Sequence, residues 1–144
     1  MRHQTELLLH EAFSSDWALA WARALNESDE YRSAAATWEG AVGLLLDDAE
    51  PAKRRAVLLD LWHGACRSAQ VTDPDNLDSA TFVFRGNRAA WRQILTDGGS
   101  PVMALLSGRI RLAKGELSAL LPYANAAREL LGLAGSVPTR FCEG

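Results

Sequence analysis

The chain has 144 residues, of which 48% are hydrophobic and 23% charged, with a net charge of -3. This length suits one domain with one hydrophobic core, and the composition excludes a low-complexity or disordered chain. The acidic balance argues against nucleic-acid binding, which needs clustered lysines and arginines to neutralise phosphates. The charges are uneven, since residues 1–50 carry ten acids and three bases, whereas residues 85–114 carry six bases and one acid. An anionic group is therefore predicted to dock near the second stretch.

Membrane and metal signals are weak. No apolar run approaches the ~20 residues that span a bilayer, and residues 1–9 lack the pattern of a signal peptide, so a cytoplasmic location is the expectation. Cys66 and Cys142 lie far apart and outside any C-x-x-C motif. Reduced, non-catalytic thiols are favoured over a disulfide or a zinc site. We expect no cofactor and no metal.

We expect a single domain over 1–144, with helices over about 5–38, a sheet and further helices over about 39–132, and a tail over 133–144. Trp17, Trp21 and Leu25 recur at helical spacing after the capping cluster SSD, which predicts a helix that stops near Asn26. A second helix is expected over 29–38, capped by Ser28. Both tryptophans are interpreted as core or lid residues in preference to specific ligand contacts.

The hydrophobic period changes at Gly40 from helical to alternating. Val42, Leu44 and Leu46 point one way, and the residues between them point the other. The segment 56–63 alternates in the same manner, with Val57, Leu59 and Leu61 opposite Leu58, Asp60 and Trp62. A charged turn that contains Pro51 separates the two segments, which predicts an antiparallel hairpin.

A weaker strand over 66–71 precedes the loop DPDNLD. This loop begins like a calcium loop, but the sixth and twelfth positions hold Asp78 and Phe84 instead of glycine and glutamate. The mismatch disfavours calcium.

The second half alternates short strands and helices. We expect a strand over 81–85, a helix over 87–95 ended by Gly98–Gly99, a helix over 101–107 capped by Ser100, and a strand over 109–113. In the last strand Ile110 and Leu112 should point inward and the two arginines outward. A final helix should run from Glu116 to about Leu131 with a kink at Pro122, followed by a loop after Gly132.

The sequence offers no catalytic constellation. His3, His10 and His63 have no ligand or triad spacing and are interpreted as structural or solvated. The turn at Gly98–Pro101 matches no phosphate-binding pattern. Asp60 is the one carboxylate at a strand centre, and a solvent-facing position is predicted for it. We therefore predict that the protein is not an enzyme.

Three segments taken together carry a family resemblance: WEGAVGLLLDD, TFVFRGNRAAWRQIL and PVMALLSGRIRLAKGELSALLPYANAAREL. With the basic–apolar alternation at Ser107–Gly115, their order resembles the sterol carrier protein 2 family of lipid-binding domains, above all its stand-alone prokaryotic members, over about Trp17 to Leu131. The resemblance implies an α+β fold in which helices cover one face of a five-stranded, mostly antiparallel sheet. It also implies an apolar tunnel that binds, without transforming, a fatty acid, acyl-CoA, sterol or isoprenoid-like lipid.

The resemblance also implies positions for the tunnel wall. These are Phe82, Phe84, Trp91, Ile94, Met103, Leu105, Leu106, Ile110, Leu112, Leu120, Leu121 and Ala124. An acidic head group is expected near Arg85, Arg88, Arg109 or Arg111, in the basic stretch. Two features depart from the family: the C-terminal FCEG is no SKL-type peroxisomal signal, and Pro122 interrupts the last helix, which could reshape the mouth of the tunnel.

Several alternatives stay open. A buried apolar stripe has the same pattern whether it faces a solid core or a cavity. An interaction module could dimerise, or bind a partner helix, through the apolar stretch Leu117–Leu131. An enzyme on a similar helix-covered sheet would need an acid or base inside its cavity. The partners expected are a lipid and no nucleic acid, with transient contact with a membrane surface and a homodimer as further options.

Overall fold

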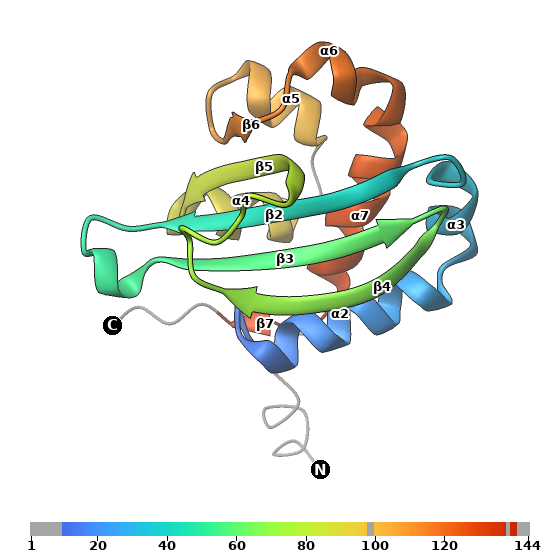
Figure 1. Ribbon diagram of the computed structural model, residues 1–144. Helices are drawn as coiled ribbons and strands as arrows, with labels where there is room; N and C mark the ends of the chain where they lie inside the picture. Colours follow the sequence, from blue (N-terminus) through green and yellow to red (C-terminus); the bar gives the residue numbers. More distant parts are fainter. Residues whose placement is uncertain (1–9, 98–99, 138, 141–144) are drawn as a thin grey trace.

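A computed structural model describes residues 10–97, 100–137 and 139–140, and its centre is an open, mixed sheet (Figure 1). Its five strands are β2 (Glu39–Asp47), β3 (Arg55–Trp62), β4 (Ala65–Thr72), β5 (Ala80–Asn87) and β6 (Arg111–Lys114), in the order β4-β3-β2-β5-β6. The β2–β5 pairing is parallel and the other pairings are antiparallel. The expected α+β fold and the β2–β3 hairpin are confirmed.

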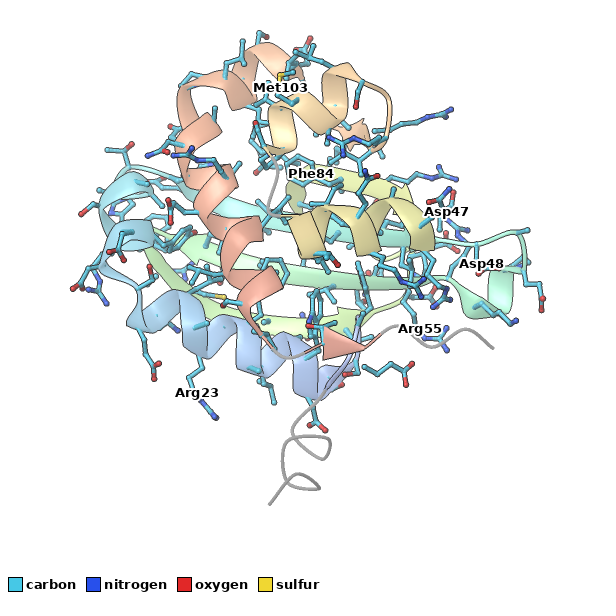
Figure 2. All side chains as sticks on the ribbon, turned by 180° about the vertical axis from the view of Figure 1, so that it is seen from behind. Arg23, Asp47, Asp48, Arg55, Phe84 and Met103 are labelled. Atoms are coloured by element: carbon cyan, nitrogen blue, oxygen red, sulfur yellow. The ribbon has the colours of Figure 1, made fainter. Side chains whose placement is uncertain are left out.

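The helices lie over one face of this sheet and at its margins. They are α2 (Ser15–Glu27), α3 (Asp29–Ala34), α4 (Arg88–Asp97), α5 (Pro101–Leu106), α6 (Leu117–Leu120) and α7 (Ala124–Ser136), with 3-10 turns η1 (Pro51–Lys53) and η2 (Leu121–Tyr123). In Figure 1 α2, α4 and α7 lie behind the sheet, and in Figure 2, seen from the opposite side, they lie in front of it. Both views place α5 and α6 together at one end of the molecule, beyond β5.

The predicted helix starts are confirmed by their caps. The Ser14 side chain accepts a hydrogen bond from the Trp17 amide (3.2 Å), and Ser28 accepts one from the Tyr31 amide (3.1 Å). Ser100 caps α5 in the same way. Each serine satisfies an amide that has no partner inside the first turn of its helix. The second helix ends at Ala34, four residues before its predicted end.

The predicted alternation in the hairpin separates two layers of the structure. Val42, Leu44 and Leu46 pack with Val57, Leu59 and Leu61 in the main core under the helices. On the other face Leu45 and Ala56 form a smaller cluster with Val83, Ala80 and Leu77. Leu77 comes from the loop between β4 and β5, so that loop covers part of the sheet face without helices.

Aromatic side chains fill the main core. Trp17, Trp21 and Trp91 are fully buried, which confirms the interpretation of the first two as core residues. The Trp17 ring lies 5.1 Å from the Phe13 ring and 5.2 Å from that of Trp21. The Trp21 indole N–H donates to the Leu130 carbonyl (2.9 Å), which joins α2 to α7 across 109 residues of sequence.

The C-terminal prediction was wrong in two respects. The single kinked helix is broken instead: α6 ends at Leu120, η2 contains Pro122, and α7 begins at Ala124. Proline lacks the N–H that a continuous helix requires. The loop predicted after Gly132 is helical to Ser136, because Ala134 and Val137 are buried in the core.

Two short strands were not predicted. β1 (His10–Glu11) and β7 (Thr139–Arg140) pair in parallel. Each is two residues long, too short to produce an alternating pattern. β6 begins at Arg111, two residues later than the strand predicted over 109–113, because Arg109 and Ile110 belong to the turn after α5.

Some predictions fall outside the described residues. They concern His3, residues 5–9 of the predicted helical region, the helix end at Gly98–Gly99, Cys142, and the last residues FCEG. Within the described ranges, every helix is too short or too polar to cross a bilayer.

Candidate functional site

An apolar groove of about 420 Å³ lies between α5, β6 and α6. Its lining combines Leu105 of α5, Ile110 and Leu112 around β6, and Leu117 of α6, together with Gly108, Arg111 and Gly115. The volume lies within the roughly 300–1,000 Å³ that small-molecule sites occupy. Side chains from three successive elements thus form one apolar surface with few polar groups.

Two glycines shape the groove by turning the chain at either end of β6. Gly108 has φ +80° and follows α5, and its amide donates to the Leu105 carbonyl (3.2 Å). Gly115 has φ +90°, and a Cβ there would lie 2.5 Å from Cδ1 of Phe82. Side chains of L residues disfavour this backbone region. Gly108 therefore serves as the predicted helix stop, and Gly115 as the predicted strand exit.

A second, polar hollow of about 280 Å³ adjoins the apolar groove. Its lining is Asp47, Arg85, Gly86, Asn87, Gly108, Arg109 and Arg111, so it shares Gly108 and Arg111 with the groove. Arg85 and Arg111 are directly opposite each other in the β5–β6 pair. Like charges in this position destabilise a sheet.

Asp47 neutralises one side of this hollow. Oδ2 of Asp47 accepts a hydrogen bond from Nε of Arg85 (2.9 Å) and lies 2.8 Å from Nη2 of the same arginine. The other carboxylate oxygen, Oδ1, lies 3.1 Å from Nε of Arg54. The hydrogen bond from Arg85 is the largest cause that lowers the pKa of Asp47, although partial burial acts in the opposite direction. Asp47 is thus the counter-ion of Arg85.

The four predicted head-group arginines differ in their ion pairing. Arg85 pairs with Asp47, and Nη2 of Arg88 lies 3.6 Å from Asp48. Arg109 donates to the Ser107 hydroxyl (3.2 Å). Within the described part of the chain, neither Arg109 nor Arg111 forms a salt bridge, and both are exposed. These two cations are the ones available to an incoming anion.

Asp47→Asn should change how stability depends on pH. Because the folded pKa of Asp47 lies below its ordinary value of 3.8, the ionised carboxylate stabilises the fold above that value, and this contribution is lost as the pH falls through the folded pKa. Urea unfolding from pH 2 to 6 should show a gap between wild type and variant that grows with pH and levels off above about pH 5. A gap of constant size over this range would contradict the assignment.

The structure places the predicted tunnel residues in four settings. Leu105, Ile110 and Leu112 line the apolar groove. Ala124 is half-buried at the start of α7. The large side chains on β5 and α4, with Leu120, are buried in the main core: Phe82, Phe84, Trp91, Ile94 and Leu120. The remaining three are exposed: Met103, Leu106 and Leu121.

The apolar tunnel that the resemblance implies is not shown by the described residues; they form an open groove instead. The sequence prediction missed Leu117 as a lining residue. One feature of the sequence could have identified it: Leu117 follows Gly115 and Glu116 directly, so it lies in the first turn of a helix that starts next to the end of β6. Whether a side chain there faces a groove depends on how α6 packs, which the helical pattern does not specify.

Three reactive side chains of the described residues lie outside the groove, in settings that do not suit acid–base or nucleophilic chemistry. Asp60 is paired with Arg67 (3.1 Å) on the face of the sheet without helices, which confirms its predicted solvent-facing position. His63 is exposed and lies 2.6 Å from Glu39. Burial raises the pKa of the Cys66 thiol to about 11, so it is protonated and weakly nucleophilic at neutral pH.

Comparisons with known proteins give related structures. No family model and no curated protein matches the chain. A crystal structure of sterol carrier protein 2 is 44% identical, with 88% of this chain and 99% of that chain covered and a TM-score of 0.81. A conserved hypothetical protein of Thermus thermophilus, described as a candidate sterol carrier protein, is 42% identical over 93% of this chain and 94% of that chain, with a TM-score of 0.80.

A more distant structure shares the fold. Sterol carrier protein 2 of Yarrowia lipolytica, in its apo form, is 15% identical, covers 89% of this chain and 97% of that chain, and has a TM-score of 0.55. The two relatives above 40% identity match this chain over nearly their full length. The chain therefore belongs to the sterol carrier protein 2 family.

Proposed function

We propose that the protein binds a single-chain lipid without transforming it and carries it between sites of release and uptake. The apolar tail would lie along Leu105, Ile110, Leu112 and Leu117, and the acidic head group beside Arg109 and Arg111. The names of the related structures support a lipid as the ligand class. A fatty acid or acyl-CoA fits the charges better than a neutral sterol or isoprenoid.

The observation that supports this proposal best is that the two hollows share lining residues. An apolar groove of about 420 Å³ and an arginine-lined hollow of about 280 Å³ share Gly108 and Arg111. A molecule with an apolar tail and an anionic head would satisfy both surfaces at once. The head would also supply Arg111 with a negative charge, as Asp47 does for Arg85 on the neighbouring strand.

A carrier role, rather than catalysis, agrees with the chemistry of the site. Its charged residues are arginines, which stay protonated and suit anion recognition better than proton transfer. The one carboxylate that lines the hollow, Asp47, is ionised and paired with Arg85. These residues would hold a ligand by charge and shape.

The alternative of an interaction module that uses Leu117–Leu131 has less support. The large apolar side chains Leu120, Leu130 and Leu131 are buried in the protein's own core. They are therefore not presented to a partner helix or to a second copy, and Leu121 is the large apolar side chain of this segment that is exposed.

Lipid binding can be tested on the whole protein. Native mass spectrometry and lipid extraction after gentle purification should reveal a co-purifying lipid, and the delipidated protein should take up a fluorescent fatty acid at micromolar concentration. A fatty alcohol of equal chain length should bind at least about tenfold more weakly, because it lacks the charge that the arginines recognise. Absence of both a co-purified lipid and any uptake of fatty acid or acyl-CoA would overturn the proposal.

A further inference from the structure

The polar hollow contains one carboxylate among its cations. Its charged lining residues are Arg85, Arg109 and Arg111 against Asp47, a net charge of +2. Asp47, labelled in Figure 2, is the last residue of β2, and its side chain is 30% exposed. A charge that is only partly buried in the wall of a hollow acts on a ligand as well as on its ion-pair partner. Asp47 therefore affects which anions the hollow accepts.

Contacts on both carboxylate oxygens hold Asp47 in place. Oδ1 accepts a hydrogen bond from the Asp48 amide (3.1 Å) and lies 3.1 Å from Nε of Arg54. Oδ2 contacts both Nε and Nη2 of Arg85, at 2.9 and 2.8 Å. Charge-assisted hydrogen bonds are stronger than neutral ones and fix the geometry of the groups that form them. One edge of the Arg85 guanidinium is thus directed at Asp47 and is not available to a ligand.

The charge of a bound head group determines how strongly Asp47 opposes it. The attraction of the head to the arginines and its repulsion from Asp47 both increase in proportion to its charge. The cost of removing the head from water increases faster, with the square of its charge. Because Asp47 lowers the net attraction, it shifts this balance against a doubly charged head.

We propose that Asp47 is a specificity-determining residue, which makes the polar hollow prefer a head group with one negative charge, such as a carboxylate, over a head group with two, such as a phosphate monoester. Arg109 and Arg111 supply the attraction. Asp47 limits it by occupying Arg85 and by repelling a second charge. This inference rests on the proposed lipid-binding function, because it concerns the head group of that ligand. It favours a free fatty acid over an acyl-CoA, whose phosphates carry several negative charges.

Two probes of matched shape isolate the effect of charge. Dodecyl sulfate and dodecyl phosphate have the same chain and a tetrahedral head, but at pH 8 the sulfate carries one negative charge and the phosphate about two. The wild type, titrated with micromolar probe, should bind the sulfate at least about threefold more tightly than the phosphate. In Asp47→Asn, phosphate binding should tighten at least about fivefold and sulfate binding only about twofold, since the change in interaction energy is proportional to the charge of the head.

Asp60→Asn is the matched control. Asp60 is also paired with an arginine, Arg67 (3.1 Å), and the substitution removes the same charge. Asp60 lies opposite Ala41, six residues before Asp47 on β2. This separation is roughly 20 Å along the strand, longer than the Debye length at physiological salt. The ratio of the two affinities should keep its wild-type value. An equal change of the ratio in the control would mean that net charge governs binding and would overturn the proposal.

A double variant tests whether local charge is the cause. D47N/R85Q removes the ion pair as a whole, so the lining keeps its net charge of +2 and no unpaired Arg85 is left behind. It should regain the wild-type preference for the sulfate. If its preference stayed as in Asp47→Asn, the charge of Asp47 would not set the selectivity. Thermal unfolding of each variant shows that it is folded.

Uptake of dodecanoic acid separates this proposal from the proposed function. If the wild type binds dodecanoic acid but binds dodecyl phosphate as tightly as the sulfate, the assignment of Asp47 is wrong while lipid binding stands. The same conclusion holds if Asp47→Asn leaves the ratio unchanged. If no form binds dodecanoic acid or either probe, the proposed function itself fails.

Discussion

Trp91→Ala should lower the free energy of unfolding by about 4 kcal/mol, as expected for a fully buried tryptophan. The Trp91 ring lies 5.7 Å from that of Phe13, and its indole N–H donates to the Leu45 carbonyl on β2 (3.0 Å). Alanine would leave both a cavity and a buried carbonyl without its partner. Denaturant unfolding measures the loss, and Trp91→Phe should restore part of it by refilling the space.

Trp62→Ala is the matched control for this prediction. Trp62 is 42% exposed at the end of β3, where Arg67 lies 4.9 Å from its ring. Removing it should cost less than about 1 kcal/mol, the range of an exposed cation–π contact. Comparing the two variants also tests whether Trp91 belongs to the protein core or to the wall of a ligand cavity. If Trp91→Ala were as mild as the control and instead altered lipid uptake, Trp91 would belong to a ligand cavity.

Leu105→Glu should weaken the binding of a fatty acid by at least about tenfold, or ~1.4 kcal/mol. The new carboxylate would stand in the apolar groove, where it must be desolvated by an apolar tail and would repel the acidic head group. Leu117→Glu, on the α6 wall of the same groove, should have a comparable effect. Titration with a fluorescent fatty acid measures both, and a thermal unfolding curve for each variant shows that it is folded.

The control for the groove variants is Leu19→Glu. It adds the same charge at an exposed leucine of α2, away from the groove. It should bind the fatty acid with the affinity of wild type. Equal losses in the control and the groove variants would mean that net charge, and not the groove, governs binding. Unchanged binding in both folded groove variants would place the tail elsewhere.

Much of the fold was predictable from local sequence. Ser14, Ser28 and Ser100 identified the starts of three helices because a serine oxygen satisfies an amide only a few residues away. The alternation in β2 and β3 assigned each side chain to a face because a strand has a period of two. Leu105, Ile110 and Leu112 were also identified as candidates through the family resemblance, and the arginines around them through the local excess of positive charge.

Other features required the tertiary structure. Nothing local indicates that Thr139–Arg140 pairs with His10–Glu11, because such contacts join distant segments. The β2–β5 pairing is likewise non-local. The last helix continues to Ser136 because Ala134 and Val137 find space in the core, a packing effect that overrides the weak helix propensity of Gly132 and Gly135.

The distinction between core and site was also decided by packing. The sequence by itself determined that the chain has apolar stripes, a basic stretch at 85–114 and glycine turns around β6, since these depend only on residue type and spacing. Only the tertiary structure separated Phe84 and Trp91, which are buried, from Leu105 and Leu112 in the groove and from Met103, which is exposed. An apolar side chain has the same pattern in all three settings, and its role follows from which elements pack against it.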